Sequence, residues 1–139
     1  MPFRIAKTFT VESGHLLSKN PGACRFPHGH SRTIEIVVTS ATLDSADMVY
    51  DFKVLKSATA RIVERFDHTF AVNSSDPRFS EWRAAYGEHV VAFPNTDPTT
   101  EVLARMIFEN VRSELAIPGV RVEKVRVTET ATSWAEYWE

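Results

Sequence analysis

The sequence predicts an α+β fold in which two helices lie on one face of a four-stranded antiparallel sheet. Four segments alternate apolar and polar residues or concentrate β-branched ones, and they form one pair at each end of the chain: 3–11, 28–42, 120–129 and 134–138. Between the two pairs, the stretches 53–66 and 97–111 carry apolar residues at helical spacing. Strands grouped apart from helices are typical of this class of domain.

The first two strands are predicted by different signals. The N-terminal strand places its apolar residues on one face, interrupted by Lys7, and they are Phe3, Ile5, Phe9 and Val11. A loop rich in turn residues follows at 18–23. The second strand is dominated by β-branched residues between Thr33 and Thr39. It is long enough to pair with the first.

The first helix, 53–66, carries one apolar stripe. The loop behind it, 73–87, leaves room for a helical turn at 79–86, and 89–93 is a candidate for a short extra strand. The second helix has a marked start, with Asp97 as the cap and Pro98 at the first helical position. Two long strands then complete the order strand, strand, helix, helix, strand, strand.

Four strands leave such a sheet with two open edges. Natural proteins usually cover open edges or pair them with another chain, because unpaired backbone groups invite aggregation. We therefore expect subunits to join edge to edge into an oligomeric barrel.

Length and composition exclude several classes of protein. The chain has 139 residues, of which 43% are hydrophobic and 24% charged, as expected for one globular domain spanning 1–139. The net charge of −2 argues against a nucleic-acid partner. No apolar run approaches the ~18 residues of a membrane helix, and no secretory signal is visible. The single cysteine indicates a reducing compartment, so we expect a cytoplasmic protein, or a thiol kept for its chemistry.

The most informative motif is His28-Gly29-His30 at the start of the second strand. Residues two apart on a strand point to the same face, so both imidazoles aim at one point. His15 ends the neighbouring strand and is the best candidate for a third ligand. Three histidines would bind Zn²⁺ and leave an open coordination position, as catalytic zinc sites do. Alone, the motif is more often two hydrogen-bonded strand histidines; His15 and the nearby Cys24 favour the metal.

Three further features are candidates for a site. Cys24 lies in a turn-rich loop beside Arg25, where it is either a zinc ligand or a thiolate base or nucleophile. Asp67 and His68 are adjacent, and a carboxylate that orients an imidazole makes a general acid–base unit. Glu129 ends the third long strand, where it could accept two N–H bonds from a guanidine-like ligand edge. For the last two features, a helix-terminal histidine and a solvent-facing glutamate are the simpler structural interpretations.

Taken in order, these pieces resemble the 6-pyruvoyltetrahydropterin synthase and 6-carboxytetrahydropterin synthase family over almost the whole chain. The matching segments are Glu12-Ser13-Gly14-His15, Cys24 with His28-Gly29-His30, Asp51-Phe52 with Leu55-Lys56, Asp67-His68, Pro98-Thr99-Thr100-Glu101 and Glu129-Thr130. None is decisive alone, but their shared order is specific. The resemblance implies the tunnelling fold (T-fold), in which antiparallel ββααββ subunits join into a barrel, usually as a homohexamer built from two trimers.

The resemblance also implies a role for each residue in a reaction that starts from 7,8-dihydroneopterin triphosphate, a small-molecule pterin. His15, His28 and His30 would hold Zn²⁺ as Lewis acid. Cys24 would abstract a proton as thiolate, and His68, oriented by Asp67, would relay one. Contacts to the substrate would come from Glu129, Thr99 and Thr100. The family's active site lies between subunits.

The spacing of three residues between Cys24 and His28 is similar to that of bacterial 6-carboxytetrahydropterin synthases. The expected products are then 6-carboxy-5,6,7,8-tetrahydropterin, acetaldehyde and triphosphate, on the route to queuosine and other deazapurines. The alternative is a 6-pyruvoyltetrahydropterin synthase or another dihydropterin lyase or aldolase. A second alternative is a zinc- and pterin-binding protein without catalysis, motivated by Arg32 after the histidine pair and by the long segment 74–95. Arg32 also stands, with Lys19 and Arg25, among the candidate triphosphate-binding cations.

Overall fold

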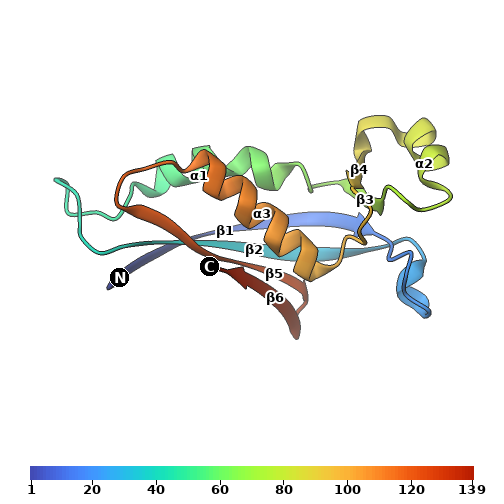
Figure 1. Ribbon diagram of the computed structural model, residues 1–139, viewed down its shortest axis with the longest axis horizontal. Coiled ribbons are helices and arrows are strands. Elements are labelled where there is room, and N and C mark those ends of the chain that lie inside the picture. Colours follow the sequence, from blue (N-terminus) through green and yellow to red (C-terminus); the bar gives the residue numbers. More distant parts are fainter.

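The computed structural model describes residues 1–139, which build one sheet of six strands in the order β4-β3-β1-β2-β5-β6. The four strands predicted from the sequence are β1 (Phe3–His15), β2 (His28–Ser40), β5 (Val120–Thr130) and β6 (Ser133–Trp138). They pair antiparallel, β1 with β2, β2 with β5, and β5 with β6. Figure 1 shows β1 and β2 running along the length of the molecule. The α+β class and both strand pairs are confirmed.

The prediction of a four-stranded, purely antiparallel sheet is wrong, because two short strands extend it beyond β1. β3 (Thr69–Asn73) pairs parallel with the end of β1, and β4 (Val90–Phe93) pairs parallel with β3. These strands have five and four residues, too few for a clear alternation in the sequence. Only the segment 89–93 carries a strand signal, and that candidate is confirmed.

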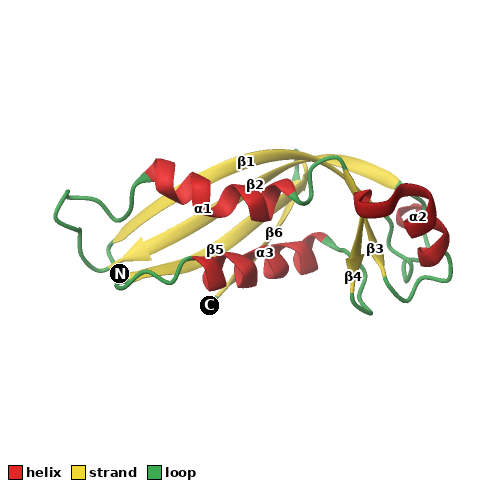
Figure 2. Cartoon of the chain, turned by 90° about the horizontal axis from the view of Figure 1, so that it is seen from above, coloured by secondary structure: helices red, strands yellow, loops and turns green.

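Two helices cover one face of the sheet, α1 (Phe52–Glu64) and α3 (Thr100–Glu114). Figure 2 shows them lying across the long strands. The side chain of Asp51 caps α1 by accepting two backbone N–H bonds of its first turn. The core between helices and strands is made of buried aliphatic and aromatic residues that include Val11, Ile34, Ile36, Leu55, Val63, Phe93, Leu103, Ile107, Val125 and Val127.

The start of α3 differs from the prediction. Thr99 is the cap, so Asp97 and Pro98 both precede the helix. Asp97 is instead buried, and its carboxylate accepts bonds from the backbone N–H of Lys19 at 2.9 Å and from the amide of Asn73 at 3.0 Å. Because the carboxylate is used in these tertiary bonds, the neighbouring threonine hydroxyl takes the capping position. Asp97 thereby ties the loop after β1 to the end of β3.

A third helix, α2 (Phe79–Tyr86), develops from the helical turn allowed by the sequence. Trp82 packs edge-on against Phe70 of β3, with ring centroids 5.5 Å apart. Phe70 faces the same side of the sheet as Gly14, whereas the next residue, Ala71, belongs to the core under α1 and α3. α2 therefore packs on the face of β3 that bears Phe70. Figures 1 and 2 show α2 at the end of the molecule where β1 ends.

The sheet has open edges in this single chain. β6 has no neighbour on its outer side, and β1 pairs with β3 only from Ser13 to His15. The outer strand carries two exposed tryptophans, Trp134 and Trp138. These edges are compatible with the expected barrel, whose subunit number stays a prediction.

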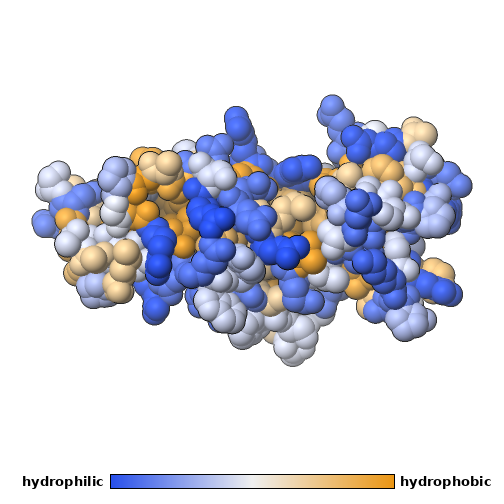
Figure 3. Space-filling view, in the orientation of Figure 1, coloured by the Kyte–Doolittle hydropathy of each residue, from blue (hydrophilic) through white to orange (hydrophobic).

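On the face seen in Figure 3, apolar patches are interrupted by hydrophilic side chains.

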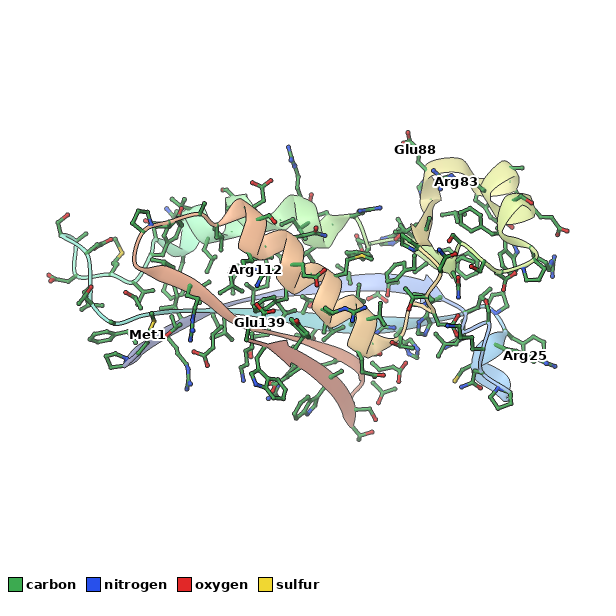
Figure 4. The ribbon with its side chains drawn as sticks, in the orientation of Figure 1. Met1, Arg25, Arg83, Glu88, Arg112 and Glu139 are labelled. Carbon is green, nitrogen blue, oxygen red and sulfur yellow. The ribbon has the colours of Figure 1, made fainter.

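The chain end is tied to the helical layer. Arg112 of α3 forms an ion pair with Glu139, and Figure 4 shows both side chains together near the middle of the molecule. Arg25, in the connection between β1 and β2, lies instead at the end that also carries Arg83 and Glu88 (Figure 4). No helix has the length and apolar character needed to cross a bilayer.

Candidate metal centre and catalytic residues

The pairing of β1 with β2 brings the three predicted histidines together. His15 lies opposite His28, and Ser13 lies opposite His30, so all three imidazoles share the face covered by the helices. Their ring centroids are 4.5, 5.1 and 5.0 Å apart. One nitrogen of each ring can be chosen so that all three lie within 4.8 Å of one another. This is the geometry expected of ligands that converge on one ion.

Backbone carbonyls set the orientation of two of the rings. His15 Nδ1 lies 2.8 Å from the carbonyl oxygen of Pro98, and His28 Nδ1 lies 2.7 Å from that of Phe26. A carbonyl only accepts, so each Nδ1–H donates, and Nε2 is the ring nitrogen left for a metal ion. His15 Nε2 lies 3.2 Å from His30 Nε2. A hydrogen bond from the second ring nitrogen, like those to Pro98 and Phe26, is the usual way in which proteins orient metal-binding histidines.

The donor set fits Zn²⁺. Zinc accepts neutral imidazole nitrogens at about 2.0–2.1 Å in a tetrahedral arrangement. Two such ligands lie about 3.3 Å apart, which matches the 3.2 Å between His15 Nε2 and His30 Nε2. Three protein nitrogens leave a fourth position for substrate, as in catalytic zinc sites.

Burial and a nearby cation keep two of the three histidines, His15 and His30, neutral. Burial lowers the pKa of His15 to about 4, the contact with Pro98 opposes this, and the positive charge of Arg32 adds to the lowering. Burial, and then Arg32, also lower the pKa of His30. Both rings are therefore neutral near pH 7, and a metal ion need not displace a proton from them.

The buried neutral ring of His15 predicts that metal-free protein loses stability in acid. Between its folded pKa of about 4 and the ordinary value of 6.5, the unfolded chain binds a proton that the folded chain does not. The free energy of unfolding should therefore fall as pH drops below ~6.5 and level off near pH ~4, by roughly 3 kcal/mol in total. Urea titrations in EDTA at several pH values measure this.

The matched variants are His15→Gln and, as the control, His89→Gln, since His89 is exposed. The first should flatten the pH dependence between the two pKa values, and the second should leave it as in the wild type. Equal pH dependence in wild type and His15→Gln would contradict the assignment to His15.

Glu129 lies beside the histidines. Its Oε1 is 3.6 Å from His30 Nε2 and 3.9 Å from His15 Nε2. The pairing of β5 with β6 skips this residue, because Thr128 pairs with Trp134 and Thr130 with Ser133. A β-bulge of this kind redirects a side chain, here a carboxylate at the edge of the cluster.

The Asp67–His68 pair is a real contact, not only a sequence neighbourhood. Asp67 Oδ2 lies 3.0 Å from His68 Nδ1, and Asp67 Oδ1 accepts the backbone N–H of Glu12 at 2.8 Å. The bond from Glu12 and then that from His68 lower the pKa of Asp67. The His68 ring is 76% exposed, and its backbone has a φ of 55°, in the left-handed region. It is an oriented, accessible imidazole outside the cluster of three histidines.

The remaining predicted residues have mixed surroundings. Cys24 is exposed on a short 3₁₀ turn (Ala23–Arg25), and its thiol forms no hydrogen bond within the chain. Both threonine hydroxyls are already engaged, since that of Thr99 caps α3 and that of Thr100 accepts from Arg32. Arg32 itself is 1% exposed, unlike a surface cation for triphosphate.

Sequence reasoning missed an aromatic cavity of about 640 Å³ on the α2 side of the sheet. It is lined by His68 and His89 together with Pro27, Phe70, Trp82 and Tyr86. The spacing of Trp82 and Tyr86, four residues apart, was the available signal, because it places both on one face of a helix. The inward direction of Arg32 had a similar signal, since it alternates in step with His28 and His30.

The sequence matches one family of known proteins over almost its whole length. Residues 4–139 match the family model described as 6-pyruvoyl tetrahydropterin synthase. A 6-carboxy-5,6,7,8-tetrahydropterin synthase from Aquifex aeolicus is 34% identical, covering 100% of this chain and 99% of that protein. One from Bacillus subtilis is 30% identical over 97% and 84%, respectively.

Solved structures give the same fold. An uncharacterized protein from Wolinella succinogenes superposes with a TM-score of 0.85 at 25% identity, covering 99% of this chain and 98% of that one. The 6-pyruvoyl tetrahydropterin synthase of Caenorhabditis elegans superposes with a TM-score of 0.73 at 21% identity, over 99% and 95%.

Proposed function

Because the chain belongs to the 6-pyruvoyl tetrahydropterin synthase family, we propose that it converts 7,8-dihydroneopterin triphosphate and one water molecule into 6-carboxy-5,6,7,8-tetrahydropterin, acetaldehyde and triphosphate. The observation that supports this most directly is the convergence of three imidazoles next to a carboxylate. Relatives named for this reaction at 34% and 30% identity favour the carboxy product. A reducing cytoplasm suits the free thiol of Cys24.

His15, His28 and His30 would hold Zn²⁺, which when bound supplies Lewis acidity toward the side-chain hydroxyls of the substrate. Pro98 and Phe26 fix two of these rings through their carbonyl oxygens, so the ligand atoms are preorganised before binding. Burial keeps the His15 ring neutral, with its one proton on Nδ1 and none on Nε2.

Four residues would act on the substrate directly or through a neighbour. Glu129 accepts N–H bonds from the guanidine-like edge of the pterin ring, for which a carboxylate is the natural partner. Cys24, as thiolate, takes a proton from a side-chain carbon. His68 returns or relays that proton. Asp67 orients the ring of His68 and stabilises its protonated form, because it is held in place by the backbone of Glu12.

The active site is proposed to form between subunits of a homohexamer. The ring of His68 is 76% exposed and lies outside the histidine cluster of its own chain. The open edges of β1 and β6 provide backbone groups for pairing with a second chain. Closing the barrel would then bring His68 of one subunit toward the cluster of another.

A 6-pyruvoyl product is the second candidate, favoured by the description of the family model. Incubating zinc-loaded protein with 7,8-dihydroneopterin triphosphate and following pterins and acetaldehyde by mass spectrometry separates the two. We expect a 6-carboxy pterin together with acetaldehyde, which forms only if a carbon–carbon bond is cleaved. A 6-pyruvoyl pterin without acetaldehyde would identify the protein as a 6-pyruvoyltetrahydropterin synthase instead. Pterin binding without conversion would instead identify a non-catalytic paralogue. The protein would then have no catalytic step on a route to queuosine.

A further inference from the structure

The largest fully buried side chain of the molecule is that of Arg32, which is 1% exposed. It follows the histidine pair on β2 and lies opposite Val11 of β1, on the same face as all three histidines. A guanidinium cation is strongly disfavoured in such a place unless its N–H groups are bonded. The contacts of Arg32 therefore indicate what its burial achieves.

Three acceptors bind the guanidinium from three different elements. Nε donates to the hydroxyl of Ser13 at 2.9 Å, and Nη1 donates to the hydroxyl of Thr100 at 3.0 Å and to the carbonyl of Thr128 at 3.3 Å. Ser13 belongs to β1, Thr100 opens α3 and Thr128 belongs to β5. A planar fork with fixed donor directions holds three such elements at set distances, which a flexible ammonium group cannot do.

Each acceptor lies next to a residue of the proposed site. Ser13 is two residues before His15 on the same face of β1. Thr100 is two residues after Pro98, whose carbonyl orients the His15 ring. Thr128 directly precedes Glu129, the bulged residue that has no partner on β6. The bond from Arg32 to the carbonyl of Thr128 therefore fixes the peptide group between Thr128 and Glu129. β6 does not pair with Glu129 and cannot fix it in the same way.

The third guanidinium nitrogen of Arg32, Nη2, faces the ring of His15. Nη2 lies 3.4 Å from His15 Nδ1, whose proton already goes to the carbonyl of Pro98, so the ring offers it no lone pair. Arg32 makes no direct ion pair, and Glu129 is the carboxylate that acts on it electrostatically.

We propose that Arg32 is a positioning residue that holds His15 and Glu129 at fixed places around the metal and pterin site through its bonds to Ser13, Thr100 and Thr128. The inference rests on the proposed function for the identity of the ligands, but its contacts belong to this chain alone. Arg32 acts through other residues and does not touch the substrate. Its loss should therefore disturb both the metal coordination by His15 and the pterin binding by Glu129.

The test uses Co²⁺ as a spectroscopic metal probe and 7,8-dihydroneopterin as the pterin probe. The variants are Arg32→Met, Glu129→Gln and the double variant. Arg126→Met is the matched control, because Arg126 stacks on Trp134 and pairs with Glu136 on the other face of the sheet. Arg32→Lys is a second variant that retains the charge and loses the fork, in case Arg32→Met fails to fold.

We expect Arg32→Met to bind Co²⁺ about tenfold more weakly, at the low end of the range for a lost partner of a metal ligand, because Arg32 acts on His15 only through Ser13 and Thr100. Its d–d absorption spectrum should also change. Arg32→Lys should give a smaller change in the same direction, and Arg126→Met none. Since Arg32 acts through Glu129, the effects of Arg32→Met and Glu129→Gln on pterin affinity should be less than additive. Arg126→Met and Glu129→Gln should add.

Wild-type Co²⁺ spectra in both Arg32 variants, or strictly additive effects with Glu129→Gln, would overturn the role of Arg32. That failure differs from failure of the proposed function. If the wild type itself bound no Co²⁺, the metal centre would be removed, and the role assigned to Arg32 at that centre would be overturned with it. If the wild type bound Co²⁺ but no pterin, the Co²⁺ spectra of the variants would still decide the role of Arg32 at His15.

Discussion

Replacing both His28 and His30 by alanine is expected to give a folded protein that retains no zinc and has no measurable synthase activity. The two side chains supply two of the three converging nitrogens, and a single remaining imidazole cannot hold the ion. Both rings are only partly buried, so their truncation removes little of the core. Metal content by mass spectrometry, with far-UV circular dichroism for the fold, measures both expectations.

His89→Ala is the matched control for this double variant. His89 is exposed and lies in the aromatic cavity, outside the cluster of His15, His28 and His30. It should retain one zinc ion per chain. Zinc bound at full stoichiometry in the His28 and His30 double variant would show that the ion binds elsewhere, and the proposed reaction would lose its Lewis acid.

The cluster of histidines was predictable because it depends on two local rules. Alternation on β2 places His28 and His30 on one face, and antiparallel pairing brings the end of β1 against the start of β2. Both rules operate within 16 residues of chain from His15 to His30, where a single hairpin connection decides the geometry. The neighbouring carboxylate of Glu129 was also identified, as a residue at the end of its strand.

The features missed by sequence reasoning depend on distant contacts. Asp97 was the predicted cap of α3, but Thr99 is the observed cap, because Asp97 accepts bonds from Lys19 and Asn73. β3 is a five-residue strand whose pairing with β1 spans more than fifty positions. Burial of Arg32 needs acceptors on three elements at once. No periodicity within one segment contains that information.

Substituting Cys24 by alanine is expected to reduce turnover by about 10²–10⁴-fold, the usual contribution of a positioned acid–base group, while zinc remains bound. The thiol is exposed, forms no hydrogen bond within the chain and is absent from the group of converging ligands. Its loss should therefore affect neither the fold nor the metal. Steady-state rates with 7,8-dihydroneopterin triphosphate, together with zinc content, measure the two effects separately.

Zinc content and activity, measured together, distinguish three possible roles of Cys24. If Cys24 were a metal ligand, as its place before the histidine pair also allows, Cys24→Ala would lose zinc and activity together. If it were only a small surface residue, neither would change. Loss of activity alone is expected from a proton-transferring thiolate, and His68→Gln should then give a loss of similar kind, because proton abstraction and return are parts of one reaction. Full activity in Cys24→Ala would leave His68 and its Asp67 partner as the acid–base unit to test next.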